Sequence, residues 1–220
     1  IIILFNYKME FENIYKSRKV VIEMLQLRGY DTSKYDSQTK EELNILYQQH
    51  GSKGNSEIDT LDIIVENNEK LFVKYINSNK IRNQIIINTI DEIYESDILD
   101  KEDILMIITK DKVSYQGALE EHINRIFYKD AIFAQILWLN SLMFNITEHD
   151  LVPKYRIMNL DDKKELLDKL YLDNEKNLPK ILVTDPVAKF YGVRIGDLCE
   201  IEYTNETNGN NKFYRLCIPS

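Results

Sequence analysis

The prolines of this chain are confined to its last third. They are Pro153, Pro179, Pro186 and Pro219. Proline removes a backbone donor and interrupts helices and central strands, so the proline-free stretch before Pro153 can hold long helices and buried strands. The remainder must be divided more sharply by turns. We therefore expect two structural units, residues 1–145 and 146–220, with the boundary close to Asn145–His149.

Composition favours a globular chain that binds nucleic acid poorly by itself. The 220 residues are 44% hydrophobic and 29% charged, with a formal net charge of −8. This length and apolar content suit one large or two small domains. Affinity for phosphate needs a basic face, which an acidic chain lacks. Two cysteines, Cys199 and Cys217, do not suggest a disulfide scaffold and favour a reduced, intracellular compartment.

The first residues carry no signal for a membrane. The apolar run Ile1–Phe5 is far shorter than the ~20 residues of a membrane span, so we expect no membrane partner. Met9 opens a helix-like stretch, and we interpret the residues before it as a candidate non-native extension.

The first unit alternates helix and strand patterns. Apolar residues from Phe11 to Leu25 recur at helical spacing, and Gly29 stands where a C-cap would fall. A short helical pattern surrounds residues 43–46, and Ser114 is expected to cap a helix that ends near Phe127. Further patterns predict a helix over 81–94 and strands over 61–65, 71–76, 104–109, 132–139 and 142–146. The fold class predicted for this unit is α/β, with a mixed sheet flanked by helices.

The second unit predicts a small α+β domain. Asn159 can cap a helix, and Thr184 or Asp185 can cap a shorter one that starts at Pro186 and stops at Gly192. Strands are expected over 180–183, 198–203 and 212–218, the last two forming a hairpin around a turn at 204–211.

No motif in the chain indicates a cofactor or a metal. The seven glycines are scattered, so a phosphate-binding loop is absent from the sequence. His50, His122 and His149 show no metal-ligand spacing. Cys199 and Cys217 fall on neighbouring expected strands, where small buried side chains are the simplest interpretation.

One arrangement allows an enzyme as an alternative. Asp62 lies on the first expected strand, and Glu69 and Lys74 flank the second. A metal-dependent nuclease needs a carboxylate two residues before the lysine, so that both project from one strand face. Phe72 occupies that position. Solvated surface charge is therefore the preferred interpretation of these residues, and no catalytic residue is predicted.

A basic pair precedes one of the expected helices. Lys110 and Lys112 stand before Ser114, where a helix N-terminus could contact phosphate. The alternative is an ordinary charged loop.

Several motifs of the second unit occur in the order and spacing of one family. They are NITEHDLVP over 145–153, LPKI over 178–181, TDPVAKFYGVRIG over 184–196, Glu206-Thr207, and YRLC over 214–217. These segments resemble the fifth subunit shared by the eukaryotic nuclear DNA-directed RNA polymerases, and the corresponding small subunit of the archaeal RNA polymerase. The likeness covers about 75 residues. More weakly, Arg28-Gly29-Tyr30 resembles the eukaryotic jaw domain, whose fold is similar to nucleases without their active site.

The resemblance implies a non-catalytic subunit with two domains, a jaw followed by an assembly domain. The assembly domain would dock on the largest polymerase subunit beside other subunits, and the jaw would lie near downstream duplex DNA within the complex. Transcription factors are further partners that it allows. The implied location is the nucleus, or a viral factory or virion for a large DNA virus. The residues implied at the subunit interface are His149, Pro153, Thr184, Asp185, Pro186, Val187, Ala188, Tyr191, Gly192, Gly196 and Arg215.

The sequence departs from the family in two places. Where the family has KRG this chain has Arg194-Ile195-Gly196. Glu200 and Glu202 replace basic or neutral residues of the following strand, so we expect the electrostatic contacts there to differ from those of the family. The DNA-facing turn of the jaw corresponds only to Ser114–Gly117. Two hypotheses besides the polymerase subunit stay open at this point: a nuclease-like DNA-processing enzyme, and a free adaptor for transcription factors.

Overall fold

The computed structural model describes residues 2–51, 61–76, 78, 81–205 and 209–220. The chain separates into two compact units, Ile1–Phe144 and Asn145–Ser220. None of the helices in the described part has the length and apolar character needed to cross a bilayer.

The first unit is built on a mixed four-stranded sheet. Its strands lie in the order β1-β2-β3-β4, with β1 antiparallel to β2 and the other neighbours parallel. The strands are β1 (Ile63–Glu66), β2 (Lys70–Ile76), β3 (Ile104–Thr109) and β4 (Phe133–Trp138). Helices α4 (Asn83–Glu95) and α5 (Ala118–Asp130) make the crossovers between the parallel strands. These strands and α4 confirm the patterns predicted over 61–65, 71–76, 81–94, 104–109 and 132–139.

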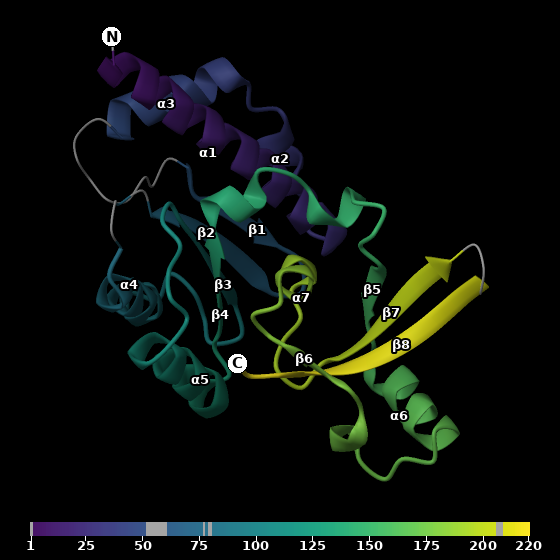
Figure 1. Ribbon diagram of the computed structural model, residues 1–220. Coiled ribbons are helices and arrows are strands. Elements are labelled where there is room, and N and C mark those ends of the chain that lie inside the picture. The colour runs from purple at the N-terminus through teal and green to yellow at the C-terminus, as the bar shows by residue number, and fades with distance from the viewer. Residues whose placement is uncertain (1, 52–60, 77, 79–80, 206–208) are drawn as a thin grey trace. The chain divides into compact units, whose positions relative to one another are not determined.

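Helices cover both faces of this sheet. Helices α4 and α5 lie side by side on one face, where Ile86 and Ile123 join a buried cluster with Leu105 and Ile136 (Figure 1). The long helix α1 (Ile2–Leu27) crosses the other face. Next to its end, Arg28 Nη2 donates to Gln135 Oε1 on β4 at 2.9 Å. The predicted helix stop holds, since Gly29 has φ 87°.

Two further helices of the described residues lie between α1 and β1 in the chain. They are α2 (Ser33–Asp36) and α3 (Lys40–Gly51), and α3 packs on α1 and contains the helical pattern seen around residues 43–46.

Two predictions for the first unit are wrong. Helix α5 begins at Ala118 rather than after Ser114, because Gly117 stands at its N-cap with φ 65° and no side chain caps that end. The apolar segment 142–146 forms no strand. Its residues belong to the 3₁₀ turns η2 (Leu139–Leu142) and η3 (Ile146–Glu148) and to the link between them. Leu142 is still buried, so its apolar character served the core rather than a strand.

The second unit has its own mixed sheet, in the order β5-β7-β8-β6. The predicted hairpin is confirmed as β7 (Leu198–Asn205) and β8 (Gly209–Ile218), and the strand predicted over 180–183 as β6 (Lys180–Leu182). Strand β7 extends to Asn205 and β8 begins at Gly209, both within the range 204–211 expected as a turn, and Glu206, Thr207 and Asn208 lie outside the described residues. The strand β5 (Lys154–Ile157), antiparallel to β7, was not predicted.

The two faces of this sheet are covered by different helices. Helix α7 (Pro186–Tyr191) covers one face, where Ala188 packs with Cys199, Ile201 and Cys217. On the opposite face α6 (Leu160–Lys169) packs Leu166 against Leu198 and Leu216. The 3₁₀ turn η4 (Glu175–Asn177) precedes β6. Both units combine helices with mixed sheets, which agrees with the α/β class predicted for the chain.

Candidate functional site

The segment 184–196 contains the short helix α7, which is capped at both ends. Asp185 Oδ1 accepts hydrogen bonds from the backbone N–H of Val187 at 2.9 Å and of Ala188 at 3.0 Å. Pro186 occupies the first turn, where its missing N–H costs no hydrogen bond. Of the two predicted caps, Asp185 is therefore the one used.

Two glycines with positive φ turn the chain after α7. Gly192 has φ 74° and ends the helix, and Gly196 has φ 93°. The N–H of Gly196 donates to the carbonyl of Cys217 at 2.9 Å, which fixes this turn against β8. Between them, Arg194 N donates to Asp197 Oδ2 at 2.7 Å. Burial raises the pKa of Asp197, and this hydrogen bond opposes the rise.

The side chains of α7 divide between the core and the surface. Ala188 is fully buried, and the ring of Tyr191 stacks on that of Tyr155 with centroids 5.5 Å apart. Pro186 is exposed and Val187 half-buried. Burial lowers the pKa of Lys189 to about 8. The motif thus closes its own core and also presents an apolar surface at its first turn.

The loop before β5 lies beside α7. Asn145 Oδ1 accepts from the backbone N and Oγ1 of Thr147, at 3.0 and 2.6 Å, and η3 contacts α7. His149 Nδ1 accepts from Leu151 N at 3.2 Å. These bonds fold the loop tightly, yet the Leu151 side chain is 83% exposed. Sequence reasoning included Leu151 in the LVP motif but did not single it out.

The remaining interface candidates of this unit have structural partners. Pro153 immediately precedes β5. Thr184 Oγ1 accepts from Ser220 Oγ at 3.1 Å, and exposed Arg215 donates through Nη1 to the carbonyl of Lys180 at 3.2 Å. The second unit thus brings η3, the start of β5 and α7 together, while Arg215 lies at the β6 edge.

Sequence reasoning missed a charged row on the face of the sheet opposite α7. Glu200 Oε1 lies 3.3 Å from Arg156 Nε and 3.0 Å from Lys212 Nζ. Arg156 Nη1 also donates to Asp162 at 2.5 Å. Burial would raise the pKa of Glu200, but the hydrogen bonds from Lys212 and Arg156 outweigh it, so this pKa is lowered. The acidic departure at Glu200 is therefore neutralised within the chain. The contact between Arg156 and Glu200 depends on β5, which was not predicted from the sequence.

The basic pair Lys110 and Lys112, predicted as a phosphate contact, belongs to the first unit. Lys110 Nζ is paired with Glu10 Oε1 at 2.9 Å. The backbone carbonyl of Lys110 accepts a hydrogen bond from Trp138 Nε1 at 3.0 Å. Lys112 and Ser114 are exposed, and neither lies on a helix. The expected helix N-terminus is three residues further on, so these side chains lie on a loop before it.

Two residues of the nuclease alternative, Asp62 and Lys74, form a largely buried ion pair, so their interpretation as solvated surface charge is wrong. Asp62 lies just before β1, and its Oδ2 is 3.4 Å from Lys74 Nζ. Phe72, at the position where a carboxylate is needed, is 6% exposed. Among the residues that the structure describes, no group of three or more His, Cys, Asp or Glu side chains could hold a metal ion.

The two cysteines are buried thiols, and desolvation raises the pKa of each to about 12.

The side chain of His50 lies outside the described residues. His122 is a buried residue of α5, with Nε2 3.0 Å from Asp91 Oδ1.

Comparison with known proteins agrees with the motifs. Residues 144–217 match the family model described as RNA polymerase Rpb5, C-terminal domain. The chain is 28% identical to the Caenorhabditis elegans protein "DNA-directed RNA polymerases I, II, and III subunit RPABC1", over 96% of this chain and 98% of the relative. It is 25% identical to the Arabidopsis thaliana "DNA-directed RNA polymerases IV and V subunit 5B", over 95% and 91% of the two chains. A Dictyostelium discoideum relative, also named a subunit of polymerases I, II and III, is 43% identical over 77 residues, or 35% of this chain and 39% of its own length. The resemblance inferred from the sequence is confirmed.

Proposed function

We propose that this chain is a non-catalytic subunit of a DNA-directed RNA polymerase, because residues 144–217 match the family model described as RNA polymerase Rpb5, C-terminal domain. The relatives that align with more than nine-tenths of the chain carry the names of polymerase subunits, which supports the assignment for both units. Phe72 occupies the position where a nuclease would need a carboxylate, which argues against catalysis by the first unit.

The second unit is the proposed assembly domain, which docks on the largest polymerase subunit. The observation that carries this is the rigid α7 motif: Asp185, Gly192 and Gly196 fix its backbone, and Pro186 stays exposed. Leu151, on the loop that contacts α7, adds a large exposed apolar side chain. A preorganised apolar surface loses little conformational freedom on binding, which favours a stable subunit contact.

The first unit is the proposed jaw, placed by the assembly near downstream duplex DNA. Its exposed Lys112 is the candidate for a local phosphate contact. The net charge of −8 means that other subunits must hold the DNA. Because two of the reported relatives are named as subunits of polymerases I, II and III, we propose that the chain acts in the nucleus.

Affinity purification of the tagged full chain from its own cells tests the assignment. We expect the large polymerase subunits to be recovered with it. Val187→Asp, which puts a charge on the half-buried surface of α7, should reduce that recovery. Leu160→Asp is the matched control, since Leu160 is 76% exposed on α6 and should tolerate the charge. Recovery of the unmodified chain alone would refute the assignment.

A further inference from the structure

Strand β5 leaves a row of backbone groups unpaired at the edge of the second sheet. Met158 N donates to the carbonyl of Leu198 at 2.9 Å, and the register pairs Arg156 with Glu200. Hydrogen-bonded and non-hydrogen-bonded pairs alternate along an antiparallel ladder. The N–H and C=O groups of Tyr155 and Ile157 therefore point away from β7. Within the described part of the chain, no group bonds to them.

Another edge strand, β1, is closed by the chain's own side chains. The hydroxyl of Tyr35 accepts from Ile64 N at 2.8 Å and donates to Ile64 O at 3.0 Å, so it takes the place of a neighbouring strand. Arg18 also donates to the carbonyl of Leu61 just before that strand. A partner strand could not pair there without displacing Tyr35.

The outer carbonyls of β6 are closed in the same way. Arg215 Nη1 donates to Lys180 O at 3.2 Å, and Asp185 N donates to Leu182 O at 3.0 Å. Of the three edges compared, β5 alone keeps both a donor and an acceptor open at successive outward positions. Natural proteins usually protect such edges, so an open one is available for strand addition.

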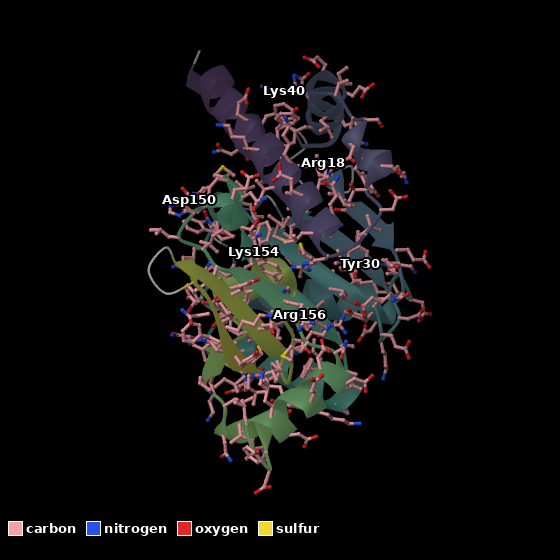
Figure 2. The ribbon with its side chains drawn as sticks, turned by 90° about the vertical axis from the view of Figure 1, so that its right-hand side faces the viewer. Arg18, Tyr30, Lys40, Asp150, Lys154 and Arg156 are labelled. Atoms are coloured by element: carbon pink, nitrogen blue, oxygen red, sulfur yellow. The ribbon has the colours of Figure 1, made fainter. Side chains whose placement is uncertain are left out.

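The side chains of β5 define the chemistry of a strand that would pair with it. Lys154 and Arg156, both labelled in Figure 2, alternate with Tyr155 and Ile157. Alternation places the two cations on one face of the sheet and the two apolar side chains on the other. Arg156 is already paired with Glu200 and Asp162, but Lys154 is exposed and makes no ion pair with a described residue. Ile157 is 39% exposed.

We infer that the open edge of β5 receives an extended segment, with alternating acidic and apolar residues, from a neighbouring polymerase subunit. The source of that segment rests on the proposed function. Its backbone would bond to Tyr155 and Ile157. Its acidic side chains would face Lys154, and its apolar side chains would extend the surface formed by Tyr155 and Ile157. Backbone pairing supplies affinity, and the alternating side chains supply specificity.

A peptide titration tests the edge directly. The probe is a six-residue peptide of alternating valine and glutamate, blocked at both ends, added to isotope-labelled full chain and followed by NMR. We expect saturable shifts at residues 154–157 and slower exchange of the Tyr155 and Ile157 amide protons. The matched valine–lysine peptide should shift them far less. Absent shifts, or equal shifts with both peptides, would overturn the inference.

Two variants separate backbone pairing from side-chain contact. Ile157→Pro removes an outward N–H but no bond of the β5–β7 ladder, and should weaken binding about tenfold. Ile157→Ala keeps that N–H and should stay within about threefold. If Ile157→Pro fails to fold, Lys154→Glu decides, because it should make the edge prefer the valine–lysine peptide. If Lys154→Glu still prefers the valine–glutamate peptide, the inference that β5 binds the segment is contradicted.

Purification of tagged chains separates this inference from the proposed function. If wild type brings down polymerase subunits and Ile157→Pro brings down fewer, the subunit assignment and the inference about β5 are both supported. If wild type and Ile157→Pro bring down equal amounts of polymerase subunits, the edge of β5 is not part of the assembly, although the subunit assignment survives. If wild type brings down none while the valine–glutamate peptide binds, the assignment fails and the polymerase origin of the segment fails with it.

Discussion

Asp185 Oδ1 accepts a hydrogen bond from the backbone N–H of Ala188 at 3.0 Å, three residues along the chain. That carboxylate replaces intrahelical acceptors that the first turn of α7 lacks. Asp185→Ala should therefore destabilise the full chain by about 1 kcal/mol, whereas Asp185→Asn should retain most of the stability. Urea unfolding of the three proteins measures this. Equal losses for both variants would show that the charge, rather than the cap, matters.

Gly192 ends the same helix with φ 74°. A side chain in the left-handed region costs roughly 1–2 kcal/mol, and β-branched residues fare worst there. Gly192→Val should therefore lower the melting temperature more than Gly192→Asn, because asparagine tolerates this conformation. If the two variants melt together, steric crowding and not backbone strain controls the site.

Local signals were the most predictable part of the fold. The caps at Asn159 and Asp185 and the stop at Gly192 each depend on residues within four positions, so the sequence contains the whole interaction. Ser114 also has a residue type and position typical of an N-cap, but it does not cap the helix. Gly117 adopts positive φ after it and starts the helix there instead.

Longer-range features were less accessible from the sequence. Strand β5 has only four residues and exists through its pairing with β7, so its own periodicity is weak. The Arg156–Glu200–Lys212 row and the closure of β1 by Tyr35 depend on registers that only the folded chain supplies. For that reason Glu200 looked like an uncompensated departure from the family.

The Asp62–Lys74 pair should matter for stability and not for catalysis. The side chains of both are largely buried, and Oδ2 of Asp62 lies 3.4 Å from Lys74 Nζ. Asp62→Ala leaves a buried ammonium and should cost roughly 3–5 kcal/mol. The double variant Asp62→Leu with Lys74→Met should recover much of this loss, because it removes both charges. Calorimetry measures the stabilities, and a duplex-cleavage assay with Mg²⁺ should show no turnover for any of the proteins.

The charged row on β5, β7 and β8 predicts a pH dependence. The pKa of Glu200 is lowered from 4.5, so its pairing stabilises the folded chain above that pH and is lost as pH falls through the folded pKa. Arg156, Lys212, Glu202 and Asp162 are the charged groups around it. Glu200→Gln should be less stable than wild type at pH 7, and the difference should shrink below pH 4.5 in urea titrations. A constant difference at every pH would contradict the assigned ion pairs.

Weak binding of the isolated chain to duplex DNA is expected from its charge. Non-specific DNA binders typically reach ~10⁻⁴–10⁻⁶ M through clustered cations that release counterions. This chain has a net charge of −8, and Lys110 is already paired with Glu10, which leaves Lys112 as the better candidate contact on its loop. Titration with labelled duplex near physiological salt should show little binding. Sub-micromolar affinity would instead make the first unit a DNA-binding module in its own right.

Within a polymerase, Lys112 should make a local contact with the DNA backbone. Lys112→Glu should leave assembly intact and weaken retention of downstream DNA at raised salt, because a single phosphate contact adds to a duplex held by other subunits. Lys110→Glu is a poorer test, since it would set a second carboxylate beside Glu10 and disturb the contact with α1. Lys34→Glu is the matched control, because that exposed lysine lies on α2, far along the chain from the loop. Equal DNA retention by the Lys112 and Lys34 variants would remove Lys112 from the proposed DNA-facing surface.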